Sequence, residues 1–217
     1  MDREIILVGS GGCMQELLWQ IEEYNKESKT DQWRVLGYVD TSAEKGEVSA
    51  GGVQYPYLGT DEILLKQKIE RNVAICVGNP DLRRKIAMIL KQNRHLHFPP
   101  IVLGDVKICP NAAIEEGCII SMQTVISTQV RLGSFTFVNI GSMLCHQTQV
   151  GSFTTLSPHV RLAGNVKVGS GCDLGMGTQV IQGIKIGDRV TTGAGSVVVS
   201  NIPSDSRVVG VPANRYI

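Results

Sequence analysis

The chain has 217 residues, with 21 Lys and Arg against 20 Asp and Glu, which gives a formal net charge of +1. This balance, without a basic stripe, argues against nucleic acid as a partner. No apolar run approaches the length of a membrane span, the N-terminus lacks a signal-peptide pattern, and the six cysteines form no CxxC pair. We therefore expect a reduced, cytoplasmic protein with room for two domains of about 100 residues each.

Residues 1–96 alternate between strand-like and helix-like segments. Strands are predicted at residues 4–8, 34–40, 53–58 and 73–77. Helices are predicted at residues 13–26, at 60–68 with Thr60 as the cap, and at 80–93 with Pro80 in the first turn. This alternation indicates a small doubly wound α/β domain, similar to a Rossmann fold. Residues 97–104, which contain Pro99 and Pro100, form the expected linker.

A glycine-rich turn, Gly9-Ser10-Gly11-Gly12, follows the first predicted strand. Glycines between a strand and a helix let backbone N–H groups approach phosphates. The dinucleotide fingerprint is incomplete, because Met14 occupies the third glycine position and Asp40 lies too far along the chain for its acidic residue. We therefore favour a nucleotide-sugar diphosphate site over an NAD site, with a purely structural turn as the alternative.

The second half, residues 105–217, repeats every six residues from residue 106 to about residue 201. The chain contains 60 Ile, Leu and Val, so chance would place four or five of them at sixteen positions, yet fifteen of the sixteen are aliphatic and Thr192 is the exception. A small or β-branched residue follows four places after each, as at Thr124 and Cys172. The sixteen positions are Ile108, Ile114, Ile120, Ile126, Leu132, Val138, Leu144, Val150, Leu156, Leu162, Val168, Leu174, Val180, Ile186, Thr192 and Val198.

This period predicts a parallel β-helix built from hexapeptide repeats, in which three units close one triangular coil. Both repeating side chains should point inward, Cys118 and Cys172 among them. Six glycines directly follow repeat positions, five of them aliphatic and one Thr192, and we expect them to ease the turns of the chain. Sixteen units correspond to about five coils.

The chemistry of a solenoid must come from side chains that point outward. His146 lies two places after the inward Leu144, and Gly164 lies three units further on, at the equivalent place of the next coil. A base beside a backbone N–H suits acyl transfer, because one group removes a proton and the other stabilises an oxyanion. The alternative is a surface histidine without a function.

Other reactive side chains receive simpler interpretations. Zinc chemistry of the carbonic anhydrase kind needs three histidine ligands, whereas the repeats offer only His146 and His159, so we expect no metal site. His159 is predicted to be a solvated corner residue. His95 and His97 are interpreted as exposed linker residues. An exposed helix face is predicted for a run of three cations, Arg83, Arg84 and Lys85, with contact to a phosphate as the alternative.

Further motifs extend along nearly the whole chain. They are the glycine turn at residues 9–12, Val39-Asp40, residues 52–59, Gly78-Asn79 with Arg83, residues 139–146, residues 163–166, residues 193–198 and residues 210–215. With these motifs the C-terminal half resembles the hexapeptide-repeat acyltransferases. The whole chain is similar to the group of nucleotide-sugar N-acetyltransferases and sialic-acid O-acetyltransferases.

The resemblance implies a homotrimer of left-handed β-helices that binds acetyl-coenzyme A (acetyl-CoA) between subunits. It implies that His146 is the general base and that the N–H of Gly164 meets the thioester carbonyl. The other implied contacts are Ala194 with the pantetheine arm, Pro212, Ala213 and Arg215 near the adenine, and Gly9, Ser10, Gly11, Gly12, Asp40, Gly78 and Asn79 with the nucleotide of the sugar substrate.

Two positions depart from the family pattern. Members often have Asp or Glu after the catalytic histidine, whereas Gln147 here can orient the ring but carries no charge. Some members have a second histidine where this chain has Thr155. The leading hypothesis is N-acetylation of a nucleotide-linked amino-deoxy sugar. The alternatives are O-acetylation of a sugar such as sialic acid, and a non-catalytic trimeric scaffold that binds a sugar nucleotide.

Overall fold

The computed structural model describes residues 3–28, 30–41, 48–50 and 52–215. The chain divides into two compact units. The first unit comprises the N-terminal residues up to Gly78 together with Leu82–Pro99. The second comprises Asn79–Asp81 and the residues from Pro100 onward.

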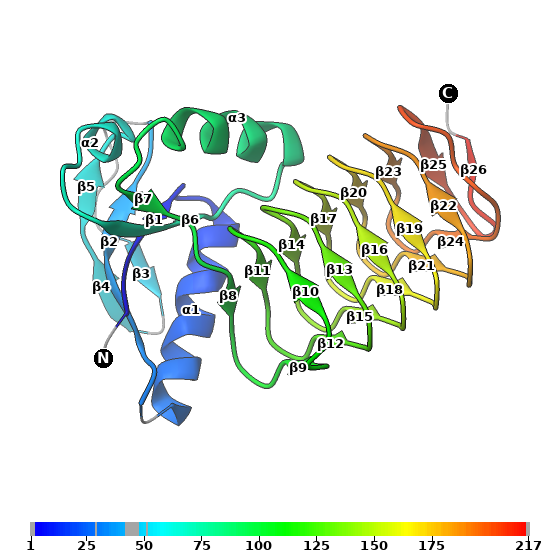
Figure 1. Ribbon diagram of the computed structural model, residues 1–217, viewed down its shortest axis with the longest axis horizontal. Helices are drawn as coiled ribbons and strands as arrows, with labels where there is room; N and C mark the ends of the chain where they lie inside the picture. The colour runs from blue at the N-terminus through cyan, green and yellow to red at the C-terminus, as the bar shows by residue number, and fades with distance from the viewer. Residues whose placement is uncertain (1–2, 29, 42–47, 51, 216–217) are drawn as a thin grey trace. The chain divides into compact units, whose positions relative to one another are not determined.

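The first unit contains a parallel sheet with the order β5-β2-β1-β6-β7 (Figure 1). Its central strand β1 is apolar and almost wholly buried from Ile5 to Val8, as expected for a parallel strand covered on both faces. A separate antiparallel pair joins β3 (Val48–Ala50) to β4 (Val53–Tyr55). The five strands of the sheet are β1 (Arg3–Val8), β2 (Trp33–Val39), β5 (Tyr57–Gly59), β6 (Arg71–Ile75) and β7 (Leu96–His97).

Three helices complete the first unit: α1 (Gly12–Glu27), α2 (Glu62–Leu65) and α3 (Pro80–Leu90), which belongs to this unit from Leu82 onward. α1 connects β1 to β2, which lies toward the β5 edge of the sheet, and α3 connects β6 to β7, which lies at the opposite edge. The order in which successive strands are added to this parallel sheet therefore reverses between β1 and β6. In doubly wound sheets, ligands bind outside the carboxyl ends of the strands at such a switch point. The predicted α/β fold class is confirmed.

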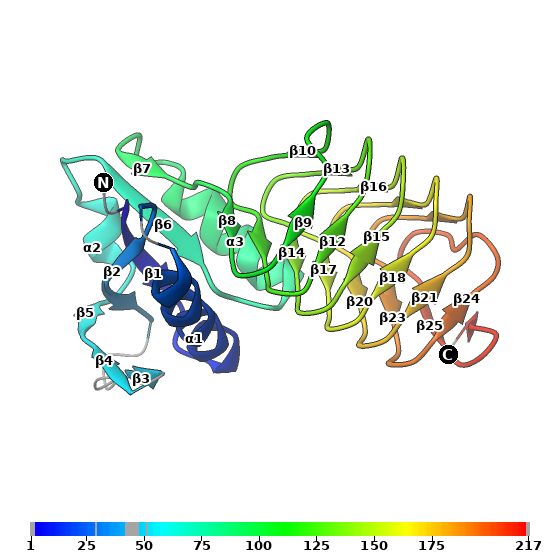
Figure 2. The same ribbon diagram turned by 90° about the horizontal axis from the view of Figure 1, so that it is seen from below.

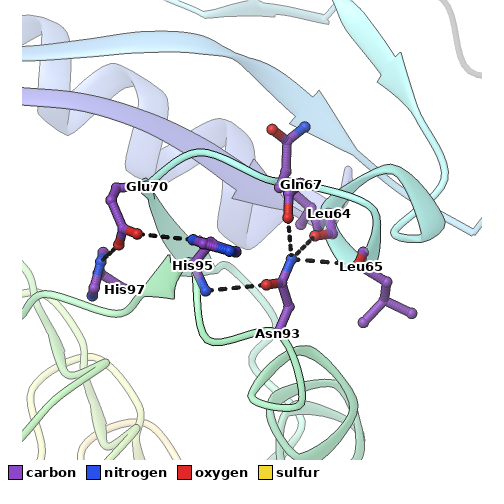
Figure 3. Close-up of polar contacts among 7 residues, drawn as sticks. All are labelled: Leu64, Leu65, Gln67, Glu70, Asn93, His95 and His97. Carbon is purple, nitrogen blue, oxygen red and sulfur yellow. Dashed lines mark hydrogen bonds and ion pairs between the residues drawn. The ribbon is translucent and has the colours of Figure 1, made fainter.

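Two predicted elements of this unit were wrong in extent. The expected strand at residues 53–58 is split into β4 and β5 at Pro56, which has no N–H to donate to a ladder. The expected helix at residues 60–68 is the single turn α2, and its N-cap is Asp61, not Thr60. Asn93 stabilises the end of that turn, because its Nδ2 donates to the carbonyls of Leu64 at 2.8 Å and Gln67 at 3.0 Å (Figure 3).

The two histidines assigned to the linker have specific partners instead. Nδ1 of His95 lies 2.9 Å from Oε1 of Glu70, and Nε2 of His97 contacts Oε2 of the same carboxylate (Figure 3). The parallel pairing of β6 with β7 brings these segments together, since Arg71 is opposite Leu96 and Asn72 is opposite His97. Hydrogen bonds with the two imidazoles lower the pKa of Glu70, and the bond with His95 has the larger effect.

The second unit is a left-handed parallel β-helix of short strands stacked coil on coil (Figures 1 and 2). Three sheets form its sides, and their strands are parallel except for the antiparallel pair β25 and β26. The sheet that joins β9, β12, β15, β18, β21 and β24 is called the β9–β24 sheet below. The strands of the second unit are β8 (Ile101–Val102), β9 (Lys107–Ile108), β10 (Ala113–Ile114), β11 (Ile119–Ile120), β12 (Val125–Ile126), β13 (Arg131–Leu132), β14 (Phe137–Val138), β15 (Met143–Leu144), β16 (Gln149–Val150), β17 (Thr155–Leu156), β18 (Arg161–Leu162), β19 (Lys167–Val168), β20 (Asp173–Leu174), β21 (Gln179–Val180), β22 (Lys185–Ile186), β23 (Thr191–Thr192), β24 (Val197–Val198), β25 (Arg207–Val209) and β26 (Asn214–Arg215).

The six-residue repeat has the structural meaning predicted for it. Each aliphatic residue of the repeat is the second residue of a strand, and up to Val180 each pairs with its equivalent in the next coil, as Ile126 does with Leu144 and Leu144 with Leu162. The side chains four places later, such as Thr124 and Cys172, are also buried. Both columns form one continuous core, so the predicted fold class of this half is confirmed.

The glycines that follow the aliphatic residues have a different role from the one expected. They lack the positive φ angle that favours glycine; the residue two places later adopts it, for example Phe135 at +58°. A Cβ on Gly151 would lie 2.6 Å from the backbone carbon of Gly169 and 2.6 Å from the nitrogen of Ser170. These glycines therefore allow neighbouring coils to pack closely.

The helices of the described residues include none that is long and apolar enough to cross a membrane. All six cysteines are free thiols. Cys172 points into the core as predicted, and its burial raises its pKa to about 11. A thiol in this environment is a packing residue, not a nucleophile.

Candidate active site

The catalytic candidate His146 lies at an exposed corner between β15 and β16. The next residue, Gln147, has φ +61°, the left-handed conformation that turns the chain at each corner of this β-helix. His146 itself is not constrained in this way, and its side chain projects away from the core formed by Leu144 and Val150.

The structure places the imidazole directly against Gly164 of the next coil. A Cβ added to Gly164 would lie 2.2 Å from Cε1 and 2.4 Å from Nε2 of His146. The backbone N–H of Asn165 donates to the carbonyl of His146 at 2.9 Å and fixes the register of the two corners. The pairing of His146 with Gly164 expected from the repeat is therefore present.

The side chain of Gln147 contacts the other nitrogen of this imidazole. Oε1 of Gln147 lies 3.3 Å from Nδ1 of His146, so an Nδ1–H can donate to it. In the neutral tautomer with its hydrogen on Nδ1, Nε2 carries the free lone pair. The nitrogen beside Gly164 is then the one able to accept a proton.

The backbone of Gly164 supplies a donor next to that nitrogen. The N–H groups on either side are occupied, since Ala163 donates to the carbonyl of Val180 and Asn165 donates to that of His146. Among the described residues, none accepts a hydrogen bond from the Gly164 N–H. A proton acceptor and an unoccupied donor thus lie side by side, as acyl transfer requires.

His159 occupies a different corner, between β17 and β18. It has φ +60°, and its ring lies against Gly141, where a Cβ would be 2.6 Å from Cε1 of His159. The side chain is exposed, as predicted for a corner histidine. Thr155, at the position of the second histidine in some family members, is buried.

The residues assigned to the coenzyme lie further along the β-helix. Ala194 is exposed at the corner before β24, and the N–H of Ala213 donates to the carbonyl of Val197 in β24 at 2.8 Å. β24 is the third strand after β15 in the β9–β24 sheet, which corresponds to roughly 14 Å along the axis. Pro212 follows a cis peptide bond and is exposed, and Arg215 ends β26, with its side chain outside the described part of the chain.

The residues assigned to the nucleotide gather at the carboxyl edge of the α/β sheet. Gly9 has φ +107° and donates its N–H to the carbonyl of Val39 at 2.8 Å. The hydroxyl of Ser10 donates to Oδ2 of Asp40 at 2.5 Å, which joins the ends of β1 and β2. Gly11 and Gly12 are exposed at the start of α1, whose first turn contains no acidic residue.

Gly78 lies beyond the end of the neighbouring strand β6, and Asn79 follows it in the chain. This edge also includes Arg83, for which the sequence interpretation favoured another place. Arg83 was predicted to be on an exposed helix face, but only 1% of it is exposed, whereas Lys85 is exposed as expected. One terminal nitrogen of Arg83 donates to the carbonyls of Val77 at 2.5 Å and Gly78 at 2.9 Å. The motif that groups Gly78 and Asn79 with Arg83 was the available sign of this contact.

No group of three or more His, Cys, Asp or Glu side chains among the described residues could hold a metal ion.

Comparison with known proteins agrees with both halves of the structure. Residues 4–90 match the family model of the PglD N-terminal domain. No curated protein sequence matches the chain.

Solved structures cover almost the whole chain. PerB from Caulobacter crescentus, in complex with CoA and GDP-perosamine, is 25% identical, with a TM-score of 0.85 over 99% of this chain and 97% of PerB. A perosamine N-acetyltransferase variant from the same organism, also in complex with CoA and GDP-perosamine, is 24% identical, with a TM-score of 0.86 over 99% and 97%. The acetyltransferase domain of PglB from Neisseria gonorrhoeae FA1090, in complex with acetyl coenzyme A, is 24% identical, with a TM-score of 0.85 over 100% of both chains.

The fold therefore defines a hexapeptide-repeat protein with a PglD-type N-terminal domain. The similarity to hexapeptide-repeat sugar acetyltransferases that the motifs indicated is confirmed.

Proposed function

We propose that the chain is an acetyl-CoA-dependent N-acetyltransferase that acts on the amino group of a nucleotide-linked amino-deoxy sugar. The observation that carries this proposal is the contact of the His146 ring with Gly164, whose N–H is unoccupied among the described residues. The similarity to PerB, which was solved with CoA and GDP-perosamine, supports the substrate class.

In the proposed mechanism the sugar amine attacks the carbonyl carbon of the acetyl thioester. The Gly164 N–H donates to the carbonyl oxygen as it becomes an oxyanion. Nε2 of His146 accepts the proton that the attacking nitrogen loses. The C–N bond has then formed, the C–S bond breaks, and the imidazolium returns the proton to the sulfur of the leaving CoA. The Gln147 side chain keeps Nε2 in the accepting tautomer.

The two ligands are assigned to separate parts of the chain. We assign acetyl-CoA to the β-helix, from Gly164 to Ala194 and the tail residues Pro212, Ala213 and Arg215. The distance of roughly 14 Å between β15 and β24 suits an elongated cofactor. We assign the nucleotide to the edge formed by the glycine turn at residues 9–12 with Asp40, Gly78 and Asn79.

We further propose that the protein acts as a homotrimer with active sites between neighbouring copies. Val125 and Met143 occupy outward positions on adjacent strands of the β9–β24 sheet, and 39% and 42% of them, respectively, are exposed. Apolar side chains at such positions suit burial against a second copy. We assign the protein to the cytoplasm, because six free thiols suit a reducing compartment.

The proposal is tested by replacement of His146 with Ala. Turnover of acetyl-CoA with a nucleotide-linked amino sugar should fall by roughly two to four orders of magnitude, whereas acetyl-CoA binding measured by calorimetry should remain. His159→Ala is the matched control, because it removes a histidine from another corner of the same β-helix, and it should leave turnover close to that of the unmodified protein.

The outcomes also separate the alternatives. Near-normal turnover in His146→Ala would remove this residue from the mechanism. A product that hydrolyses in mild base would be an ester and would indicate O-acetylation, because an amide survives that treatment. If the unmodified protein bound no acetyl-CoA, the non-catalytic scaffold would be the better explanation.

A further inference from the structure

Arg83 is a buried cation on α3 in a unit that otherwise buries mainly apolar side chains. Burial of a guanidinium group is costly unless hydrogen bonds satisfy its donors. Here the group donates to the carbonyls of Val77 at 2.5 Å and Gly78 at 2.9 Å. The position of Arg83 therefore depends on the loop that follows β6, which forms part of the edge assigned to the nucleotide.

The hydrogen bond to Val77 fixes the orientation of the next peptide group. In a trans peptide the C=O and the following N–H point in opposite directions. With the Val77 carbonyl directed at Arg83, the N–H of Gly78 must point away from the guanidinium. It points to Cys13 in α1, where this N–H interacts with the thiol sulfur. A Cβ on Gly78 would lie 3.1 Å from that sulfur, so the loop and the helix are close together.

The charge of Arg83 also affects the Cys13 thiol, on the other side of this peptide. Burial raises the pKa of the Cys13 thiol, and the positive charge of Arg83 acts in the opposite direction. Cys13 is the second residue of α1, and the N-terminus of a helix also carries a partial positive charge. The cation and the helix end therefore produce positive potential at the same place, beside the exposed Gly11 and Gly12.

We propose that Arg83 is a positioning residue for the diphosphate group of the nucleotide substrate, an inference that rests on the proposed function. It holds the Val77–Gly78 peptide against the first turn of α1, and it supplies a buried positive charge behind the surface where the phosphates bind. It acts through the backbone, because so little of its side chain is exposed.

The test compares three variants of the full-length protein, with UDP, GDP and dTDP as probes. The diphosphate that binds the unmodified protein is measured by calorimetry, and the corresponding nucleoside is measured by ligand-observed NMR. Arg83→Met removes the charge and both hydrogen bonds. Arg83→Lys keeps the charge but not the pair of hydrogen bonds in the same geometry. The control Lys85→Met removes an exposed charge from the same helix.

We expect Arg83→Met to weaken diphosphate binding at least tenfold, with nucleoside and acetyl-CoA binding changed less than threefold. Arg83→Lys should give a smaller but selective loss, and Lys85→Met should change nothing. If Arg83→Met does not fold, Arg83→Lys tests the inference by the same comparison of diphosphate binding with nucleoside binding.

The inference is overturned by unchanged diphosphate affinity in a folded Arg83 variant, by equal losses for nucleoside and diphosphate, or by failure of both variants to fold. If the unmodified protein binds none of the three diphosphates, the proposed function fails and this inference fails with it. That result is distinct from a failure confined to the Arg83 variants.

Discussion

The contact between His146 and Gly164 leads to a quantitative prediction for Gly164→Ala. The added methyl group would lie 2.2 Å from Cε1 of the imidazole, whereas ordinary contact begins near 3.4 Å. The imidazole must therefore move away by the difference between these two distances, or rotate away from the methyl group. The backbone gives no reason for strain, because Gly164 is not among the residues with positive φ. A displacement of about 1 Å at a reacting group can cost a factor of about 100 in rate.

We therefore expect Gly164→Ala to lower turnover by about two orders of magnitude without a comparable loss of stability. The assay follows release of the CoA thiol with a nucleotide-linked amino sugar, and thermal unfolding is measured in parallel. Gln182→Ala is the control, because Gln182 is the equivalent, exposed corner position of the following coil. It should leave turnover unchanged.

The double variant Gly164→Ala with His146→Ala tests the cause of the loss. If the methyl group acts by displacing the imidazole, the double variant should be about as active as His146→Ala alone. Turnover of Gly164→Ala within threefold of the unmodified protein would refute the geometry. So would a double variant in which the two losses multiply.

Three further predictions concern other parts of the chain. Gln147→Glu places a carboxylate beside the imidazole and favours its protonated form, so the acidic limb of the pH–rate profile should move to higher pH; an unmoved limb would contradict this. The pKa of Glu70 is lowered in the folded state. The stabilising effect of its carboxylate is therefore present at neutral pH and is lost as the pH falls through the folded pKa, which lies below the unfolded value of about 4.3. Glu70→Gln should therefore lower the melting temperature at pH 7 but not in acid. The control Glu62→Gln removes only the exposed ion pair with Lys66, and its effect on the melting temperature should be the same at both pH values. Gly151→Ala forces a methyl group to within 2.6 Å of the backbone of Gly169, and denaturant unfolding should show a loss of about 1–3 kcal/mol; an unchanged midpoint would show that the coils can separate without cost.

The repeat made the β-helix predictable because each coil contacts its neighbours at a fixed separation of three units. The same separation predicted that His146 lies beside Gly164. It could not show that the ring lies directly against that glycine, or that the neighbouring glycines are required by coil contact and not by turning. Those features depend on close distances between the backbones of adjacent coils.

The α/β unit was predictable only in its order of elements. The alternation of apolar runs and turn residues indicated the strands and the principal helices, and the glycine turn marked the edge that we propose binds the nucleotide. The pairing of β6 with β7, which brings Glu70 to His95 and His97, joins segments 25 and 27 residues apart without any repeat between them. The burial of Arg83 likewise depends on where the carbonyls of Val77 and Gly78 point. The sequence by itself determined the solenoid and the corner where His146 meets Gly164, because a periodic chain contacts itself periodically, whereas only the tertiary structure decided the polar contacts of the irregular half.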